Sequence, residues 1–212
     1  MRNVVVNEAQ NQPSTAERRR SFIGALYRQS RNLRSRDKHL AARARATLAR
    51  LRRSLTDPHY LPEAYDLLAE SDILAYHPAS QERPYLLVAG LFGVHPLPPQ
   101  DDGERWRLGE ALAHLGEHPS AEARLRQLLN ADFPTLEYRL RQCVQLLHSH
   151  NIPLDYRWLL EDLLEVHKCA AGSQEDYRVR LMWARSFKQR QYQLRNTTQQ
   201  PTPPSEHQGD DT

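Results

Sequence analysis

The segment PYLLVAGLFGV at residues 84–94 decides the fold of this 212-residue chain. It contains no charged side chain and is the most apolar stretch of the sequence. It is too short to span a membrane, because a transmembrane helix needs roughly 20 apolar residues. Pro84 suits the first turn of a helix, where a backbone N–H has no intrahelical partner. We therefore expect residues 84–94 to form a central core helix in a protein that does not cross a membrane.

On the amino-terminal side of this segment, residues 40–55 repeat apolar side chains in steps of three and four, the spacing of one helix face. The stripe consists of Leu40, Ala44, Leu48, Leu51 and Leu55. The positions outside the stripe include Arg43, Arg45, Arg50, Arg52 and Arg53. The pattern predicts an amphipathic helix that buries one side and offers guanidinium groups to solvent from the rest.

The same spacing predicts further helices at residues 63–75, 104–115, 121–130, 135–149, 156–168 and 174–192. Strand signals are nearly absent. We expect an all-α protein, a compact helical bundle of about seven to nine helices over residues 17–195. Two packed halves would meet near residues 95–103. The polar ends, residues 1–16 and 196–212, are predicted to be disordered tails.

Positive charge is concentrated in one block of the sequence. Residues 17–53 contain thirteen Lys or Arg and two Asp or Glu, a net charge of +11, whereas residues 54–212 carry a net charge of −8. The overall charge of +3 hides this difference. Such a field favours a phosphate backbone. Acidic protein partners and a merely solvated charged helix are the alternatives.

Arginine is also frequent later in the chain. Arginines lie two residues apart at Arg124 and Arg126 and at Arg139 and Arg141. The segment 177–196 has no acidic residue and contains Arg178, Arg180, Arg185, Lys188, Arg190 and Arg195. The planar guanidinium group gives phosphate two parallel hydrogen bonds. The aromatic residues that could stack on bases are few, and each is more often a core residue: Tyr27, Tyr138, Trp183 and Tyr192. We therefore expect backbone binding without base recognition.

A metal-dependent enzyme is the alternative that HLGEH at residues 114–118 raises, since it matches the inverted zinc-protease pattern H-x-x-E-H. That chemistry needs both histidines on one face of a continuous helix. Gly116 weakens such a helix, and Pro119 disfavours the helical conformation at the preceding residue. His148 and His150 likewise end a predicted helix. We expect neither pair to bind zinc.

The remaining polar patterns also favour a protein without catalysis. Glu161, Asp162 and Glu165 lie close on one predicted helix with no second cluster to face them, so we expect an exposed acidic face. Cys143 and Cys169 lack the spacing of a metal or redox motif and are expected to be free thiols. We expect no enzyme activity, no metal and no cofactor. The sequence contains no secretory pattern, which predicts a cytoplasmic protein.

The order of these segments resembles the CasB family, the small subunit of the type I-E CRISPR interference complex Cascade. The resemblance covers about residues 18–193. It rests on ARLRR at 49–53, YLLVAGLF at 85–92, RLGEAL at 107–112, ARLRQLL at 123–129, YRLRQ at 138–142, PLDY at 153–156 and VRLMWARSF at 179–187. Two positions depart from the family pattern. Gln142 stands where some members carry arginine, and Tyr156 follows Asp155 where tryptophan is more usual.

The resemblance implies an all-helical, non-enzymatic protein that lies as a two-copy filament along the belly of the complex. There it would contact the guide–target heteroduplex and help to hold the displaced DNA strand. Its partners would be guide RNA, both strands of target DNA, other Cascade subunits and a second copy of itself. No membrane partner or cofactor is implied.

The resemblance also assigns roles to particular residues. Arg52 and Arg53 match the arginine pair that faces nucleic acid, and Arg124 and Arg141 match basic positions in the two later blocks. Arg180 or Lys188 would fill the carboxy-terminal basic role. The charge pattern adds Arg43, Arg45, Arg139 and Arg185 to this predicted nucleic-acid interface.

We therefore expect a nucleic-acid-binding subunit of a CRISPR surveillance complex that stabilises the R-loop through phosphate contacts. One alternative is a purely structural helical adaptor that bridges subunits through acidic faces and apolar patches. The other is a metal hydrolase built on His114 and His118.

Overall fold

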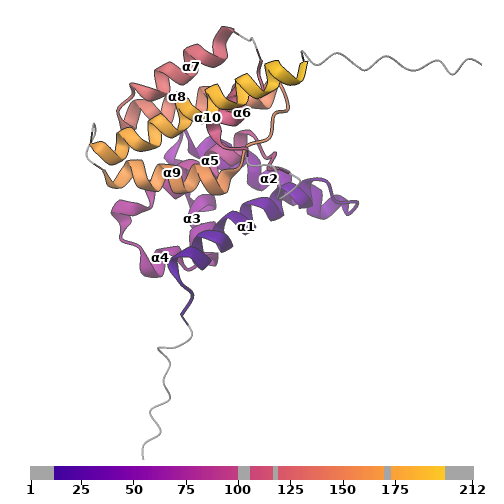
Figure 1. Ribbon diagram of the computed structural model, residues 1–212. Coiled ribbons are helices and arrows are strands. Elements are labelled where there is room, and N and C mark those ends of the chain that lie inside the picture. Colours follow the sequence, from indigo (N-terminus) through magenta and orange to yellow (C-terminus); the bar gives the residue numbers. More distant parts are fainter. Residues whose placement is uncertain (1–11, 100–105, 117–118, 170–172, 199–212) are drawn as a thin grey trace, which may run out of the picture.

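The computed structural model describes residues 12–99, 106–116, 119–169 and 173–198, which fold into an all-α protein without a strand among them (Figure 1). In chain order the helices are α1 (Thr15–Leu33), α2 (Lys38–Ser54), η2 (Pro58–Tyr60), α3 (Leu61–Glu70), α4 (Ile73–Tyr76), η3 (Ala79–Gln81), α5 (Arg83–Val94), α6 (Leu108–Ala113), α7 (Pro119–Leu129), α8 (Phe133–Ser149), α9 (Tyr156–Lys168) and α10 (Gln174–Thr198). The helices labelled η are short 3-10 helices. The all-α prediction is confirmed.

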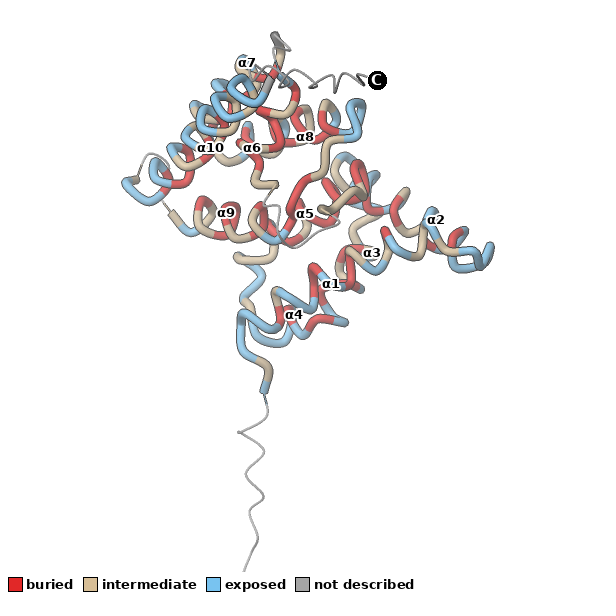
Figure 2. The backbone as a smooth tube through the Cα atoms, turned by 45° about the vertical axis from the view of Figure 1, so that its right-hand side comes forward, coloured by how far each residue is buried: buried red, intermediate tan, exposed pale blue. Residues whose placement is uncertain are grey.

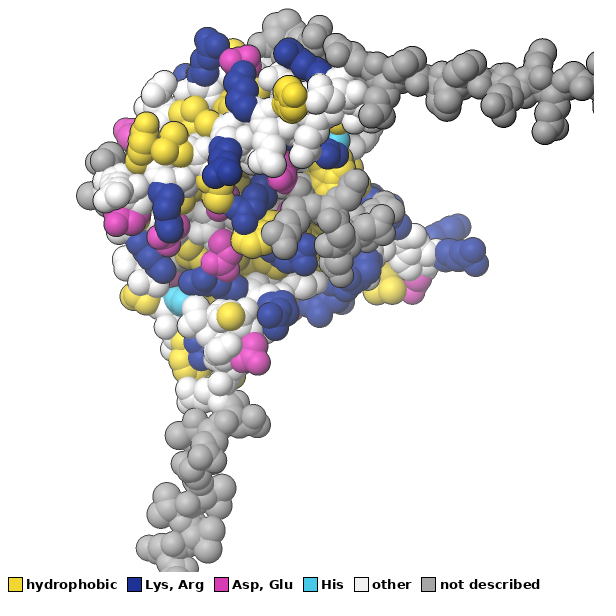
Figure 3. All heavy atoms as spheres, viewed as in Figure 1, with side chains coloured by type: hydrophobic (Ala, Val, Ile, Leu, Met, Phe, Trp, Pro, Cys, Tyr) yellow, Lys and Arg dark blue, Asp and Glu magenta, His cyan; other side chains and the backbone are white. Residues whose placement is uncertain are grey.

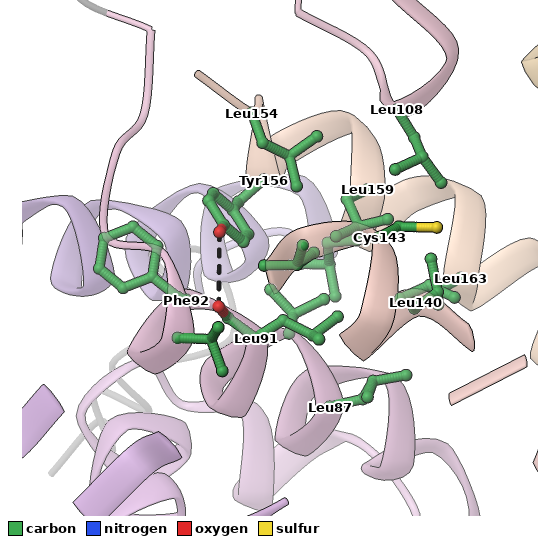
Figure 4. Packing of buried hydrophobic residues seen from close by; sticks show 14 of the residues in the cluster. Leu87, Leu91, Phe92, Leu108, Leu140, Cys143, Leu154, Tyr156, Leu159 and Leu163 are labelled. Carbon is green, nitrogen blue, oxygen red and sulfur yellow. Dashed lines mark hydrogen bonds between the residues drawn. The ribbon is translucent and has the colours of Figure 1, made fainter. Parts of the chain in front are cut away.

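Helix α5 lies at the centre of the molecule, with α2 and α3 against one part of it and α8 and α9 against another. Every residue from Leu87 to Val94 is buried (Figure 2). In the close view of Figure 4, Leu91 and Phe92 pack with Tyr156 of α9. The Tyr156 hydroxyl donates a 2.6 Å hydrogen bond to the carbonyl oxygen of His95, just after α5. The prediction of a central core helix is confirmed.

Two glycines of α5 allow α2 to approach it closely. A Cβ at Gly93 would lie 2.5 Å from the backbone nitrogen of Arg52 and 2.8 Å from the carbonyl oxygen of Leu48. A Cβ at Gly90 would lie 2.6 Å from Cγ of Leu55. Backbone-to-backbone packing of this kind tolerates only a hydrogen at these positions. The apolar side of α2 therefore rests directly on α5.

A second close approach joins α6 to α10. A Cβ at Gly109 would collide with the Trp183 carbonyl oxygen and the Ser186 hydroxyl. The Trp183 ring is fully buried, and its Nε1 donates a 2.7 Å hydrogen bond to the Asp162 carboxylate of α9. These contacts hold α6, α9 and α10 together, and α9 also contacts α5 and α1.

Two helix predictions need correction. The helix expected at residues 63–75 is two helices, because Asp72 adopts a left-handed backbone conformation with φ of 55° between α3 and α4. The helix expected at residues 104–115 begins only at Leu108, since Arg107 has extended backbone angles and its N–H donates to the Glu110 carboxylate. Residues 104 and 105 lie outside the described ranges.

The apolar stripe predicted for α2 is correct except at its first member. Ala44, Leu48 and Leu51 are buried and Leu55 is half-buried, but Leu40 is 44% exposed. Leu40 lies in the first turn of α2, ahead of the part that packs on α5. The core contact of this helix therefore begins at Ala41 rather than at Leu40.

The helical region extends slightly beyond its predicted bounds. Helix α1 begins at Thr15 because the Ser14 hydroxyl accepts from the Glu17 N–H while the Glu17 carboxylate accepts from the Ser14 N–H. Helix α10 continues to Thr198. Most residues of the two predicted disordered tails lie outside the described ranges.

The close approach of α2 and α5 predicts the effect of a methyl group at Gly93. Gly93→Ala forces one helix to move, and we expect the free energy of unfolding to fall by about 1–3 kcal/mol. Gly24→Ala in α1 is the matched control, because its Cβ meets nothing within 4 Å. The control should gain up to about 1 kcal/mol from helix propensity. Urea denaturation measures both, and equal stabilities would contradict the packing argument.

The buried Asp162 carboxylate predicts a pH dependence of stability. Burial raises its pKa to about 6, from 3.8 for an ordinary Asp, although the Trp183 hydrogen bond lowers it. The folded state therefore binds more protons than the unfolded state between about pH 4 and pH 6, and this group's contribution worsens as pH rises through that window. Asp162→Asn keeps an oxygen acceptor for Trp183 and removes the ionisation.

We expect the Asn variant to exceed the wild type by about 1–3 kcal/mol at pH 7.5 and to lose that advantage below pH 4. Denaturation of both proteins at the two pH values provides the measurement. A difference that is the same at both pH values would show that Asp162 does not titrate in this range.

Candidate nucleic-acid interface

Helix α2 forms a basic face on an arm that it builds with α1 (Figures 1 and 3). The helix contains no acidic residue. Asp37, just before it, uses its carboxylate as a cap that accepts from the backbone N–H groups of His39 at 2.8 Å and Leu40 at 3.4 Å. Arg52 and Arg53 occupy the last turn, where cations also complement the helix dipole. No carboxylate on α2 therefore neutralises its arginines.

The arginines of α2 lie in two rows beside the apolar stripe. Arg45 and Arg52 are seven residues apart and share one flank, about 10 Å apart along the axis, while Arg43 and Arg50 share the other flank. Arg50 forms a 3.0 Å ion pair with Glu63 of α3. Arg43, Arg45 and Arg52 are exposed and have no hydrogen-bonding or ionic partner among the described residues. On α2, these three are the predicted interface residues that the fold leaves without a partner.

Arg53 lies in the last turn of α2, next to Ser54, which lines a groove. Its Nη1 donates a 3.3 Å hydrogen bond to the Tyr60 hydroxyl, and its guanidinium carbon lies 5.3 Å from the Tyr60 ring centroid. Tyr60 was not among the residues predicted from the sequence. Its position after the Asp57–Pro58 turn, seven residues from Arg53, is the only signal for this pairing.

The groove next to Arg53 has a volume of about 680 Å³. The end of α2, η2, α3, the start of α5 and the first half of α8 form its walls. Two arginines line it. Arg83 is held by two hydrogen bonds to the Glu137 carboxylate, at 2.6 and 2.9 Å, whereas Arg141 has no carboxylate partner in the part of the chain that the structure describes. Tyr138, 58% exposed, lies beside Arg141.

The side chains of Arg139 and Arg141 leave α8 in different directions. Two residues rotate a helix by about 200°, so the two side chains leave α8 on opposite flanks. Arg139 and Arg124 of α7 both lie near the buried Cys143 thiol. Burial raises the pKa of Cys143 to about 12, and the two guanidinium charges oppose that shift. Both cysteines are free.

Arg124 has an unusual environment at this seam of α7 and α8. Its Nε is buried and has no hydrogen-bond partner among the described atoms. Buried guanidinium nitrogens are normally satisfied. Arg124 therefore keeps its Nε donor free at a half-buried position, and it is not among the residues that line the groove.

Comparison with known proteins identifies the family to which this chain belongs. A family model described as CRISPR-associated protein Cse2 matches residues 47–187, more than half of the chain. The chain belongs to the Cse2 family. The match confirms the resemblance to the CasB family that the sequence predicts.

Similar solved structures agree with the Cse2 assignment. The crystal structure of CasB from Thermobifida fusca has 27% sequence identity and a TM-score of 0.57, covering 78% of this chain and 97% of the other. M. ruber CasB has 30% identity and a TM-score of 0.58, covering 87% and 99%. A chain of a CRISPR RNA-guided surveillance complex shares the fold at 18% identity, with a TM-score of 0.61 over 87% and 99%. No curated protein sequence matches this chain significantly.

Arg180 is a structural residue in this Cse2 protein. It is 7% exposed and forms a 2.7 Å ion pair with the buried Asp176. Its Nη1 donates to the carbonyl oxygens of Leu128 at 2.7 Å and Leu129 at 3.2 Å, at the end of α7. The guanidinium group thus donates to carbonyl oxygens that lie at the end of α7, inside the protein. Arg180 is therefore not available for the carboxy-terminal basic role that the resemblance implies, and Lys188 is the other residue predicted for that role.

Arg185 and Lys188 are exposed on α10. Lys188 forms a 3.0 Å ion pair with Glu122 of α7, whereas Arg185 has no partner within the described ranges. Two other arginines of the same helix are engaged, Arg178 with Glu165 at 3.2 Å and Arg190 with His114 at 2.9 Å. These contacts leave Arg185 as the freest of the predicted residues here.

The metal hydrolase alternative was built on His114 and His118, and the structure describes only His114 of these two residues. Residues 12–99, 106–116, 119–169 and 173–198 contain no group of three or more His, Cys, Asp or Glu side chains that could hold a metal ion. The His114 ring packs against Trp106 with ring centroids 4.1 Å apart and a tilt of 42° between the rings, and its Nε2 accepts from Arg190. Glu117 and His118 lie outside the described residues. Glu161 and Glu165 are half-buried, and Arg19 and Arg178 pair with them.

Burial sorts the four aromatic residues considered for base stacking. Tyr27 packs on Phe92 and Trp183 is fully buried, so both belong to the core. Tyr138 and Tyr192 are 58% and 68% exposed.

Within the described ranges, no helix is both long and apolar enough to span a bilayer.

Proposed function

We propose that this Cse2-family protein is a non-catalytic, cytoplasmic subunit of a type I-E CRISPR surveillance complex. It binds guide RNA and target DNA and stabilises the R-loop through sequence-independent contacts to phosphate backbones. The exposed, unpaired arginines of α2 are the observation that carries this proposal. A second copy of the chain and other subunits of the complex are the proposed protein partners.

The distinction between paired and unpaired arginines supports this choice. An arginine that already holds a carboxylate, as Arg50 holds Glu63, adds little net field at its position. Arg43, Arg45 and Arg52 keep their full charge on a helix without acidic residues. Phosphates that approach them displace counterions, and this release supplies the affinity. Such binding needs no particular base.

The energetics of R-loops explain why weak contacts suffice. The guide–target heteroduplex is about as stable as the DNA duplex that it replaces, so backbone contacts can shift the balance. The fold of a chain in a CRISPR RNA-guided surveillance complex is the same as the fold of this protein. The roughly 10 Å between Arg45 and Arg52 corresponds to about three phosphates of a stacked strand.

The proposal predicts a salt dependence for the purified protein. If Arg43, Arg45, Arg52, Arg53 and Arg141 each neutralise one phosphate, the logarithm of the affinity for single-stranded DNA should fall with the logarithm of salt with a slope of at least about −3.5 in magnitude. Titrations by fluorescence anisotropy at several salt concentrations measure this slope. Binding that ignores salt, or no binding at low salt, would contradict the mechanism.

Arg52→Ala with Arg53→Ala should shorten the lifetime of R-loops on matched DNA. Each arginine–phosphate interaction contributes about 1 kcal/mol, so removing two weakens binding by roughly tenfold or more, nearly equally for all sequences. The matched control is Arg28→Ala with Arg126→Ala, which removes the same formal charge from residues already paired with Glu70 and Glu122. Single-molecule twist measurements on the reconstituted complex provide the lifetimes.

The control variant should behave as the wild type, and the Arg52, Arg53 variant should still assemble and load guide RNA. Equal lifetimes for all three proteins would refute the phosphate-contact role. Failure of the Arg52, Arg53 variant to assemble would favour the structural adaptor instead.

A further inference from the structure

The outer face of α10 carries six exposed side chains in one line. They recur in steps of three and four residues and fall within about 80° of each other around the helix. We call this set the α10 stripe, and it consists of Tyr177, Leu181, Arg185, Lys188, Tyr192 and Arg195. Tyr177 is 60% exposed, Leu181 49% and Tyr192 68%. Figure 3 shows dark blue basic and yellow apolar side chains together over this helix.

The stripe points away from the body of the protein. The opposite side of α10 buries Val179, Trp183 and Phe187 in the core. Those three positions account for the packing of α10 on α6 and α9, so the tyrosines of the stripe are not needed to hold the helix in place. The exposed tyrosine rings are therefore available to a binding partner.

The charge of the stripe restricts what binds there. Residues 177–196 include no acidic side chain. Arg185 and Arg195 have no partner in the described part of the chain, and the one carboxylate that pairs with Lys188 there is that of Glu122. Leu181 is the single aliphatic member of the stripe. A surface with free cations, two exposed aromatic rings and one aliphatic side chain fits a flexible polyanion with flat apolar groups.

We propose that the α10 stripe binds a single-stranded nucleic acid, with bases stacked on Tyr177 and Tyr192 and phosphates held by Arg185, Lys188 and Arg195. Base–aromatic stacking is tolerant of sequence because every base has a π-face. The two tyrosines are about 22 Å apart along the helix, a span of roughly four to seven nucleotides. This inference rests on the proposed function and adds a preference for an unpaired strand.

The preference for an unpaired strand follows from the tyrosines. Arginines that contact only phosphates serve single and double strands alike, whereas the faces of paired bases are covered by their neighbours in the duplex. Stacking on Tyr177 and Tyr192 therefore requires bases that are free of a duplex. The arginines of α2 and the α10 stripe would then make different contributions, one to charge neutralisation and the other to strand selection.

The test compares Tyr177→Ala with Tyr192→Ala, made together in the full-length protein, against the matched pair Tyr177→Phe with Tyr192→Phe. The probes are a fluorescent 15-nucleotide oligothymidine and a 15-base-pair duplex, titrated at several salt concentrations. We expect the Ala variant to bind the oligothymidine at least about tenfold more weakly and the duplex within twofold of wild type. Its salt slope should not change, because no charge is removed. The Phe variant should match the wild type.

Several results would overturn the inference. These are unchanged binding of the oligothymidine by the Ala variant, an equally weakened binding of the duplex, or an equally weakened binding by the Phe variant. A change in oligomeric state by light scattering without a change in nucleic-acid affinity would make the stripe a protein interface. Circular dichroism checks that the helices are intact, and Tyr192→Ala alone, near the end of α10, repeats the test if the double variant loses helix.

The outcomes also separate this inference from the proposed function. If the wild type binds no nucleic acid at any salt concentration, both fail together. If the affinity of the wild type falls as the salt concentration rises and the Tyr variants bind equally well, only the α10 stripe assignment fails.

Discussion

The backbone contact between α2 and α5 is the constraint on which the rest of the structure depends. It exists because Gly90 and Gly93 have no side chains, so α2 lies on α5 with its backbone at Arg52 directly above Gly93. Since α5 is the buried helix that α8 and α9 also contact, the position of α2 is set by the core of the protein. The arginines on the outer side of α2 are therefore presented by a helix packed on the core rather than by a loop.

Much of this arrangement could be predicted from the sequence because it depends on local periodicity. The apolar run at residues 84–94 indicates a buried helix by itself, and the stripe from Ala44 to Leu55 separates the buried from the exposed face of α2. The break at Asp72 could not be predicted in this way, since it depends on one left-handed residue in a segment whose spacing is otherwise helical. Leu40 fits the stripe but lies ahead of the contact with α5, which only the fold defines.

The candidate site was less predictable because it depends on contacts between distant segments. Arg180 and Arg185 look alike in the sequence, yet Arg180 is buried by carbonyl groups more than fifty residues earlier in the chain. Helical periodicity does separate Arg139 from Arg141, but it cannot say that one faces Cys143 and the other the groove. Tyr177 was not among the aromatic residues predicted to stack on bases. Its position relative to Trp183 and Phe187 already placed it on the other face of the helix.

The internal ion pair of Arg180 and Asp176 has a consequence for the outside of the protein. Together with the hydrogen bonds from Arg180 to the end of α7, this ion pair helps to fix the rotation of α10 about its axis. A shift of the helix register by one residue would turn every side chain by about 100° and carry Tyr177 and Tyr192 out of line with solvent. Arg180 and Asp176, inside the protein, thus help to set the direction in which Tyr177 and Tyr192 point.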